Sequence, residues 1–205
     1  MHLEILNKQQ VKALPHLSRF KKDFYLAGGT AIALHLGHRQ SIDFDLFSDK
    51  MINKNQILQK FKNNGFKIQN ILQDNPGEIT FISQNIKFTF LRYPFPVKAP
   101  IPINSSINIP DLLSLAALKA YALSRRNKWK DYVDLYFIIK HHHSLPDIIK
   151  MTKKIFKTEF NDKIFREALS YFKDIDYSEE VIFLPQHEVS NNTVKKYLKT
   201  ITISD

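Results

Sequence analysis

The feature that most limits the fold of this chain is the six-residue run IDFDLF, in which apolar and acidic residues alternate. Alternation with a period of two is typical of a β-strand, because successive side chains point to opposite faces. Asp43 and Asp45 therefore share one face, with β-carbons about 6.6 to 7 Å apart at the usual rise per residue. The apolar residues expected to face the core are Ile42, Phe44 and Leu46. The fold has to accommodate two neighbouring negative charges beside a hydrophobic interior.

Two carboxylates on one face of a strand can bind a divalent cation. Such hard oxygen ligands suit Mg²⁺, which keeps several waters and takes further ligands from substrate phosphates. The alternative is an exposed edge strand whose outer face happens to be acidic. The chain has no cysteine, which excludes disulfides, thiolate nucleophiles and cysteine-ligated zinc.

A glycine turn precedes the acidic strand. The apolar run at 24–27 ends at Gly28 and Gly29, which suits a strand that turns sharply into a helix. Thr30 is a plausible N-cap for this helix, and Gly37 is expected to end it. Backbone N–H groups at a helix N-terminus form a natural phosphate cradle. A glycine pair can also be a simple turn. Its position before the acidic strand is what favours a phosphate-binding turn.

Polar residues link this helix to the acidic strand. Arg39 and Ser41 lie just before Asp43, where a guanidinium and a hydroxyl could contact a triphosphate. His38 could likewise contact a nucleotide or lie on the surface. We therefore expect a phosphate-binding site beside the carboxylates.

The hydrophobic periodicity predicts an α/β (α+β) fold, in which a mixed sheet is followed by a C-terminal helical part. We divide the chain into a core at 1–105 and a helical part at 106–205 packed on it, joined through a proline-broken connection. The expected strands are 24–27, 42–47, 66–72, 79–83 and 86–93, with a hairpin at Gln84-Asn85, and the expected helices are 8–22, 53–63, 110–124, 129–141, 146–156, 161–172 and 194–198.

The charge balance favours an anionic partner. The 205 residues include 30 Lys+Arg and 20 Asp+Glu, a net charge of +10, and nucleic acid is the commonest polyanion. The alternative is a lysine-rich bias that merely keeps the protein soluble. The sequence has no long uncharged apolar run and no apolar signal region at its start. We therefore expect a cytoplasmic protein without a membrane partner.

Charged residues also interrupt the apolar pattern of the second half. Lys119 lies within the apolar run 115–123, where an ammonium group has to snorkel, pair or meet a ligand. In the helix at 129–141, Asp131 and Asp134 are three residues apart and share a flank beside the core stripe. Alternatively, these carboxylates are structural and are held by nearby cations, for which the candidates are Arg125, Arg126 and Lys128.

Two segments resemble a known family. The stretch FYLAGGTAIALHLGHRQSIDFDLFS is similar to the first two motifs of the AbiEii/AbiGii toxin family, a branch of the DNA polymerase beta-like nucleotidyltransferase superfamily. The stretch LAALKAYALSRRNKWKDYVDLYFII is similar to the third and fourth motifs, a helical lysine followed by an Arg/Lys-rich turn and K-D-x-x-D-L. The segments occur in the order and spacing of the family.

The resemblance implies a nucleotidyltransferase fold and a function. A member of this family would be an Mg²⁺-dependent enzyme that transfers an NMP group from an NTP to an acceptor, with tRNA or another RNA expected. It would act as the toxin of a toxin–antitoxin or abortive-infection system, with a cognate antitoxin as a possible partner. Two alternatives stay open: a non-catalytic nucleotide- or RNA-binding module of the same fold, and NMP transfer to a protein.

The resemblance also assigns residues. Asp43 and Asp45 match the metal ligands and, with Lys119 and Asp131, form the expected catalytic set. The residues expected to contact the nucleotide are Gly28, Gly29, Thr30, Arg39, Ser41, Lys119 and Asp134.

One position departs from the superfamily pattern. The superfamily usually supplies a third carboxylate from a neighbouring strand, and Thr89 occupies the position expected to be acidic. Asp131 or Glu78 could complete the site, two carboxylates plus phosphate could hold the metal, or the activity could be weakened. The general base is not identified by sequence.

Overall fold

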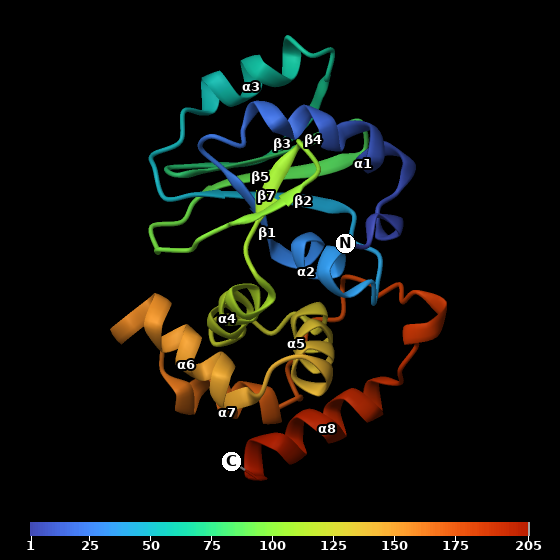
Figure 1. Ribbon diagram of the computed structural model, residues 1–205, viewed down its shortest axis with the longest axis vertical. Coiled ribbons are helices and arrows are strands. Elements are labelled where there is room, and N and C mark those ends of the chain that lie inside the picture. Colours follow the sequence, from blue (N-terminus) through green and yellow to red (C-terminus); the bar gives the residue numbers. More distant parts are fainter. Residues whose placement is uncertain (205) are drawn as a thin grey trace.

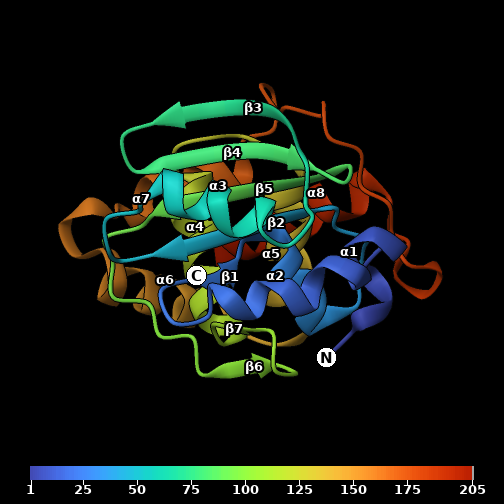
Figure 2. The ribbon, with the colours of Figure 1, turned by 90° about the horizontal axis from the view of Figure 1, so that it is seen from above.

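A mixed five-stranded sheet forms the upper half of the protein in the computed structural model, which describes residues 1–204 (Figure 1). The strand order is β1-β2-β5-β4-β3, and Figure 2 shows the strands side by side in this order. Strands β2 and β5 are parallel, whereas the other neighbours are antiparallel. The strands are β1 (Tyr25–Ala27), β2 (Asp43–Ser48), β3 (Ile68–Asn75), β4 (Glu78–Ser83) and β5 (Ile86–Arg92).

Helices cover both faces of this sheet. Helices α1 (Lys8–Ala13) and α3 (Lys54–Lys62) lie on the upper face, and α2 (Gly28–Leu36) lies on the lower face (Figure 1). Helix α2 contacts the helical lower half of the molecule, so it lies between the sheet and that half. The lower half contains α4 (Leu112–Leu123), α5 (Trp129–His141), α6 (Leu145–Phe156), α7 (Asp162–Ser170) and α8 (Asn191–Ser204).

The predicted mixed sheet and helical C-terminal part are confirmed, and strand β2 has the expected alternation. Phe44 and Leu46 are fully buried, whereas Asp43 and Asp45 are half-buried on the other face. The expectation that Ile42 faces the core is wrong. The strand begins one residue later, and the Ile42 side chain is 52% exposed.

Aromatic packing fixes the buried face of the sheet. Phe61 of α3 contacts the rings of Phe81, Phe88 and Phe90 on β4 and β5 at centroid distances of 4.8, 4.8 and 5.9 Å. Edge-to-face pairs of this kind add to the free energy of burial. Asn53 caps α3, as predicted, by accepting a hydrogen bond from the Gln56 N–H. The opposite face of β2 therefore faces α2 and the helical half.

The single helix predicted at 8–22 is divided. Helix α1 ends at Ala13, and a 3₁₀ segment, Leu14–Arg19, follows it. Pro15 lies in the first turn of this segment, and its ring nitrogen cannot donate the bond that would continue an α-helix. Val11, within α1, is 52% exposed.

The sequence predicted one hairpin that the structure contains and missed another. The predicted hairpin at Gln84-Asn85 is confirmed, and both residues have left-handed φ values of 50° and 61°, as this type of two-residue turn requires. A second hairpin, β6 (Ile101–Ile103) with β7 (Ile107–Ile109), lies in the region expected to be an irregular connection. Its turn contains the expected boundary after residue 105, and β7 lies against β1.

The helices of the lower half lie close to their predicted positions. Helix α5 has the predicted bounds, and α4 and α7 are capped by Asp111 and Asn161. Helix α6 begins after the cap Ser144, and α8 is longer than expected at both ends. Among the described residues, no helix has the length and apolar character needed to cross a membrane.

An irregular connection at 171–190 joins α7 to α8, and we call it the connecting segment. It forms isolated β-bridges to two distant parts of the chain, Lys128 with Asp176 and Arg39 with Phe183. It therefore runs beside both the start of α5 and the loop before β2.

Candidate active site

A cavity of about 490 Å³ lies where the polar face of β2 meets α2, the start of α5 and the connecting segment. Two predicted site residues, Thr30 and Asp134, lie behind its wall. The predicted residues that line it are Gly28, Gly29, Arg39, Ser41, Asp43, Asp45, Lys119 and Asp131. The structure therefore brings residues from both halves of the sequence to one place.

The two carboxylates of β2 have different surroundings. Asp43 Oδ2 lies 2.6 Å from Lys87 Nζ of the neighbouring strand β5. Within residues 1–204, the Asp45 carboxylate has no hydrogen-bond or ion-pair partner. Burial, together with the charge of Asp43, raises its pKa. Lys87, Lys119 and Arg126 offset the Asp45 charge only in part, so a bound cation would stabilise it further.

The residues at the turn into α2 have to be small, because the side chains of Asp45 and Arg39 lie close to the backbone there. Gly28 has a left-handed φ of 65°, and a β-carbon there would clash with Asp45 Oδ2. A β-carbon on Gly29 would lie 2.6 Å from Arg39 Nη2. Glycine is required at Gly28 by both the conformation and the close approach.

Thr30 does not cap the helix, which corrects the expectation from sequence. Helix α2 begins at Gly28, with Ala27 as the N-cap residue, so Thr30 lies within its first turn. The Thr30 hydroxyl instead donates to the backbone carbonyl of Asp43 and lies 2.8 Å from Ser41 Oγ. Thr30 and Ser41 thus fix the start of β2 against α2.

Asp134 is the centre of a buried ionic cluster behind the cavity. Arg39 donates to it twice, from Nε at 2.7 Å and from Nη2 at 2.9 Å, and His38 Nε2 lies 2.8 Å from Oδ1. Lys119 Nζ lies 3.0 Å from Oδ2. Burial alone would raise the pKa of the Asp134 carboxyl, but the charges of Arg39 and Lys119 hold it well below its ordinary value.

This cluster answers two questions that the sequence left open. His38 is fully buried and does not line the cavity, so it takes neither the surface position nor the nucleotide contact considered for it. Arg39 is 1% exposed and holds Asp134, although the cations proposed from sequence lay after Lys119. Arg39 still borders the cavity.

Asp131 joins the cluster to the cavity. It accepts a bond from Lys119 Nζ, and Arg126 Nε lies 2.7 Å from its Oδ2. Burial would raise the pKa of Asp131, but Lys119 and Arg126 lower it overall. Lys119, which is 6% exposed, bridges Asp131 and Asp134 and therefore pairs rather than snorkels.

The strand register shows what replaces a third carboxylate. Thr89 is the direct neighbour of Asp45 on β5, and Thr80 of β4 lies next to it with its hydroxyl 3.3 Å away. Glu78 lines the cavity and accepts a bond from Thr80 at 3.2 Å. In the described part of the chain, no group of three acidic, histidine or cysteine side chains could hold a metal ion.

The donor set nevertheless fits Mg²⁺. Asp43 and Asp45 offer oxygen ligands on one face of β2; Asp43 shares one oxygen with Lys87, and Asp45 has no hydrogen-bond or ion-pair partner among residues 1–204. Asp131 is less available because its oxygens are held by Lys119 and Arg126. Two carboxylates suit an ion that takes its other ligands from water and substrate phosphates.

Besides Arg126, four further charged residues border the cavity without having been predicted there. Lys87 lies two residues before Thr89 on β5, so strand alternation could have placed it on the same face. Lys128 and Lys130 flank the start of α5, and Glu179 comes from the connecting segment. Glu179 could not be found from sequence, because the segment that contains it has no regular hydrophobic period.

Comparison with known proteins is consistent with this geometry. The profile described as "Nucleotidyl transferase AbiEii toxin, Type IV TA system" matches residues 12–109 and 78–190. An uncharacterized protein from Aquifex aeolicus (strain VF5) is 31% identical over 212 residues, which covers 95% of this chain and 98% of that protein.

Solved structures share the fold. MenT4, a nucleotidyltransferase toxin from Mycobacterium tuberculosis H37Rv, aligns with a TM-score of 0.64 and 15% identity over 96% of this chain and 82% of its own. A putative nucleotidyltransferase from H. pylori aligns with a TM-score of 0.58 and 20% identity over 99% and 93% of the two chains. At these identities the likeness concerns the fold.

The family match together with the shared fold identifies a nucleotidyltransferase. The chain belongs to the AbiEii nucleotidyltransferase toxin family, because the family profile spans most of its length. The resemblance inferred from the motifs is thereby confirmed. Membership of a toxin–antitoxin family implies an NTP substrate and a cognate antitoxin as partner.

A glycine substitution tests the close approach at the turn. Gly28→Ala should destabilise the protein by more than Gly65→Ala, as measured by urea unfolding. Both residues have left-handed φ values, of 65° and 75°, which cost about 1 to 2 kcal/mol for other residues. A β-carbon on Gly65 has no atom within 4 Å, whereas one on Gly28 meets Asp45. Equal losses would contradict the described contact.

The buried cluster predicts a defined dependence of stability on pH. Asp134→Asn should lower the free energy of unfolding at pH 7 by about 3 to 5 kcal/mol, because Arg39 stays charged and buried without its partner. Asp23→Asn, which breaks an exposed pair with Lys50, is the matched control and should have a far smaller effect.

The sign of the pH effect follows from the lowered pKa of Asp134. Below about pH 4 the unfolded carboxyl binds a proton that the folded one does not, so the contribution of Asp134 is complete above that pH and decreases with further acidification. The difference between wild type and Asp134→Asn should therefore be constant near neutrality and shrink below about pH 4. A difference that grows in acid would contradict this account.

Proposed function

We propose that this protein transfers an NMP group from an NTP to an RNA acceptor, with tRNA as the first candidate, and that Asp43 and Asp45 hold the required Mg²⁺. The observation that carries the proposal is the half-buried Asp45 carboxylate, which faces the cavity beside Gly28 and has no partner in residues 1–204. A buried charge that the surrounding cations offset only in part is unfavourable for folding, so its position calls for a function.

The reaction needs a site that binds polyphosphate and positions a hydroxyl group. The oxygen of an acceptor hydroxyl attacks the α-phosphorus of the NTP and forms a P–O bond, and its proton passes to solvent water. The bond between the α-phosphorus and the oxygen of the β-phosphate breaks, and pyrophosphate leaves with the electron pair. When bound, Mg²⁺ would neutralise charge on the attacking and leaving oxygens. The chain would mainly position and neutralise, as in phosphoryl transfer generally.

The residues around the carboxylates suit these tasks. Gly28 and Gly29 open α2 at the cavity wall, where backbone N–H groups and the helix dipole favour phosphate. Lys119 and Arg126 border the cavity and supply positive charge for the triphosphate. Because Asp131 is held by both cations, we assign it the role of positioning them rather than that of a general base.

Thr30 and Asp134, which lie behind the cavity wall, would act by positioning other residues. Asp134 orients Arg39 and Lys119, and the Thr30–Ser41 pair fixes the start of β2. Arg39 and Ser41 border the cavity and complete the expected nucleotide contacts. The NTP would lie between the core at 1–105 and the helical part at 106–205, since both contribute to the cavity.

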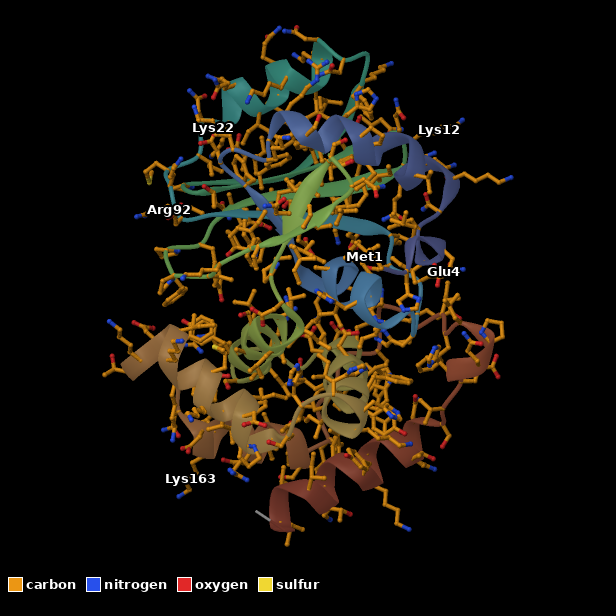
Figure 3. All side chains as sticks on the ribbon, viewed as in Figure 1. Met1, Glu4, Lys12, Lys22, Arg92 and Lys163 are labelled. Carbon is orange, nitrogen blue, oxygen red and sulfur yellow. The ribbon has the colours of Figure 1, made fainter. Side chains whose placement is uncertain are left out.

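The surface charge supports an RNA acceptor. The net charge is +10, and basic side chains such as Lys12 and Lys22 of the upper half and Lys163 of the lower half project outward (Figure 3). Neutralising backbone phosphates releases counterions, which drives binding to nucleic acid without sequence preference. In the cytoplasm, such an activity would make the protein a toxin by modifying its RNA target.

A labelling experiment tests the activity. With α-labelled NTPs, Mg²⁺ and total RNA, the wild type should transfer label to RNA, and Asp43→Asn and Asp45→Asn should each lower the rate at least about a hundredfold. Asp49→Asn, at an exposed position just after β2, is the matched control and should stay active. Label in a nuclease-resistant protein band would identify a protein acceptor instead, and nucleotide binding without any transfer would identify a non-catalytic module.

The metal assignment can be tested without turnover. In EDTA, Asp45→Asn should raise the free energy of unfolding by about 1 kcal/mol, because it removes an unpaired, half-buried charge. Mg²⁺ should raise the melting temperature of the wild type and of Asp49→Asn, but not of Asp45→Asn, because an ion that binds the folded state stabilises it. A metal-dependent shift that persists in Asp45→Asn would place the ion elsewhere.

A further inference from the structure

Two lysines at the start of α5 converge on one carboxylate inside the cavity. Lys128 Nζ contacts Glu179 Oε1, and Lys130 Nζ lies 3.4 Å from Glu179 Oε2. The two ammonium groups thus contact separate oxygens of one anion, as they would contact two oxygens of a phosphate group. Burial would raise the pKa of Glu179, but Lys128 and Lys130 lower it overall, so the carboxylate is ionised at neutral pH.

Glu179 belongs to a short span that is fixed on both sides. Before it, Asp176 bonds to the backbone at the start of α5, where Trp129 N lies 2.9 Å from Asp176 O. After it, the chain bonds to the loop before β2, where Gln40 N lies 2.8 Å from Ile182 O. The anchored backbone holds the Glu179 side chain, which is 35% exposed, at the rim of the cavity.

The other cations that line the cavity pair with acidic residues on strands or helices. Lys87 pairs with Asp43 of β2, and Lys119 and Arg126 pair with Asp131 of α5. Lys128 and Lys130 differ, because in residues 1–204 their sole salt-bridge partner is Glu179, from an irregular segment. This carboxylate can leave the lysines through a change of side-chain rotamer, without moving a helix or a strand.

We propose that Lys128 and Lys130 form a phosphate-binding subsite of the cavity, and that Glu179 is a tethered carboxylate that competes with the phosphate for them. The inference rests on the proposed function in that the cavity receives phosphorylated substrates. Two substrates could supply the group: the triphosphate of the NTP, or a backbone phosphate of the RNA acceptor. Glu179 would lower the affinity for either and would keep the lysines ordered.

Binding measurements with two probes test the subsite. Inorganic tripolyphosphate represents the triphosphate, and a short single-stranded RNA oligonucleotide without a 5′ phosphate represents the backbone. For at least one probe, Glu179→Gln should lower the dissociation constant about three- to tenfold, the range expected when half-buried ion pairs stop competing. Glu180→Gln makes the same charge change at an exposed neighbour outside the cavity lining and should have no such effect.

A second set of variants assigns the effect to the two lysines. Lys128→Gln with Lys130→Gln should weaken binding of the same probe and abolish the gain from Glu179→Gln, whereas Lys154→Gln, at an exposed position on α6, should do neither. A gain for tripolyphosphate alone identifies the NTP as the source of the phosphate, and a gain for RNA alone identifies the acceptor.

Several results would overturn the subsite. These are an unchanged or weaker affinity of Glu179→Gln for both probes, an equal gain in Glu180→Gln, and a gain that persists without the two lysines. Circular dichroism and the melting temperature of each variant separate a loss of binding from a loss of folding. Since binding is measured without turnover, absence of NMP transfer would count against the proposed function and leave this test intact.

Discussion

Asp134 carries the ionic cluster on which the arrangement of the site depends. Its carboxylate is fully buried on α5, and its partners come from the loop before β2 and from α4. Removing charges from water is unfavourable, and it is offset here because both oxygens accept well-aligned bonds from Arg39 and each has a further partner. The same cluster holds Lys119, which borders the cavity, in a single place.

The carboxylates of α5 and the Asp45 carboxylate of β2 have opposite electrostatic surroundings. Asp131 and Asp134 are surrounded by cations that lower their pKa values, so they are fixed acceptors of hydrogen bonds. Asp45 has a raised pKa beside Asp43. A carboxylate without a hydrogen-bond partner can bind a cation without first giving up another contact, and this difference is the basis on which we propose Asp45, rather than Asp131 or Asp134, as a metal ligand.

Strong periodic patterns made much of this fold predictable. The alternation around Asp43 placed both carboxylates on one face, and the apolar stripe of 129–141 gave the bounds of α5. The capping role predicted for Thr30 was wrong. A threonine beside a glycine turn can cap a helix or donate a hydrogen bond to a neighbouring strand, and the sequence does not distinguish the two. The hairpin that begins at Ile101 was missed because three-residue strands are too short to show a period.

Other parts of the site depend on contacts that are distant in sequence. Arg39 meets Asp134 across 95 positions and Lys128 meets Glu179 across 51, and no periodicity connects such residues. The resemblance to the family implied that Arg39, Lys119 and the aspartates of α5 belong to one site, but it could not show which cation holds which carboxylate. Those pairings are decided by packing between elements, so they had to come from the structure.

The bonds between Arg39 and Asp134 also limit how the molecule can move. A hinge that opened the sheet away from the helical part would have to separate this buried pair and expose both charges, which is far costlier than a rotamer change at the rim. The buried pair therefore opposes any opening of the cavity that separates the sheet from the helical part. Under the proposed function, ligands would enter and leave by side-chain motion around the span between Asp176 and Ile182, whose two ends are held by backbone hydrogen bonds.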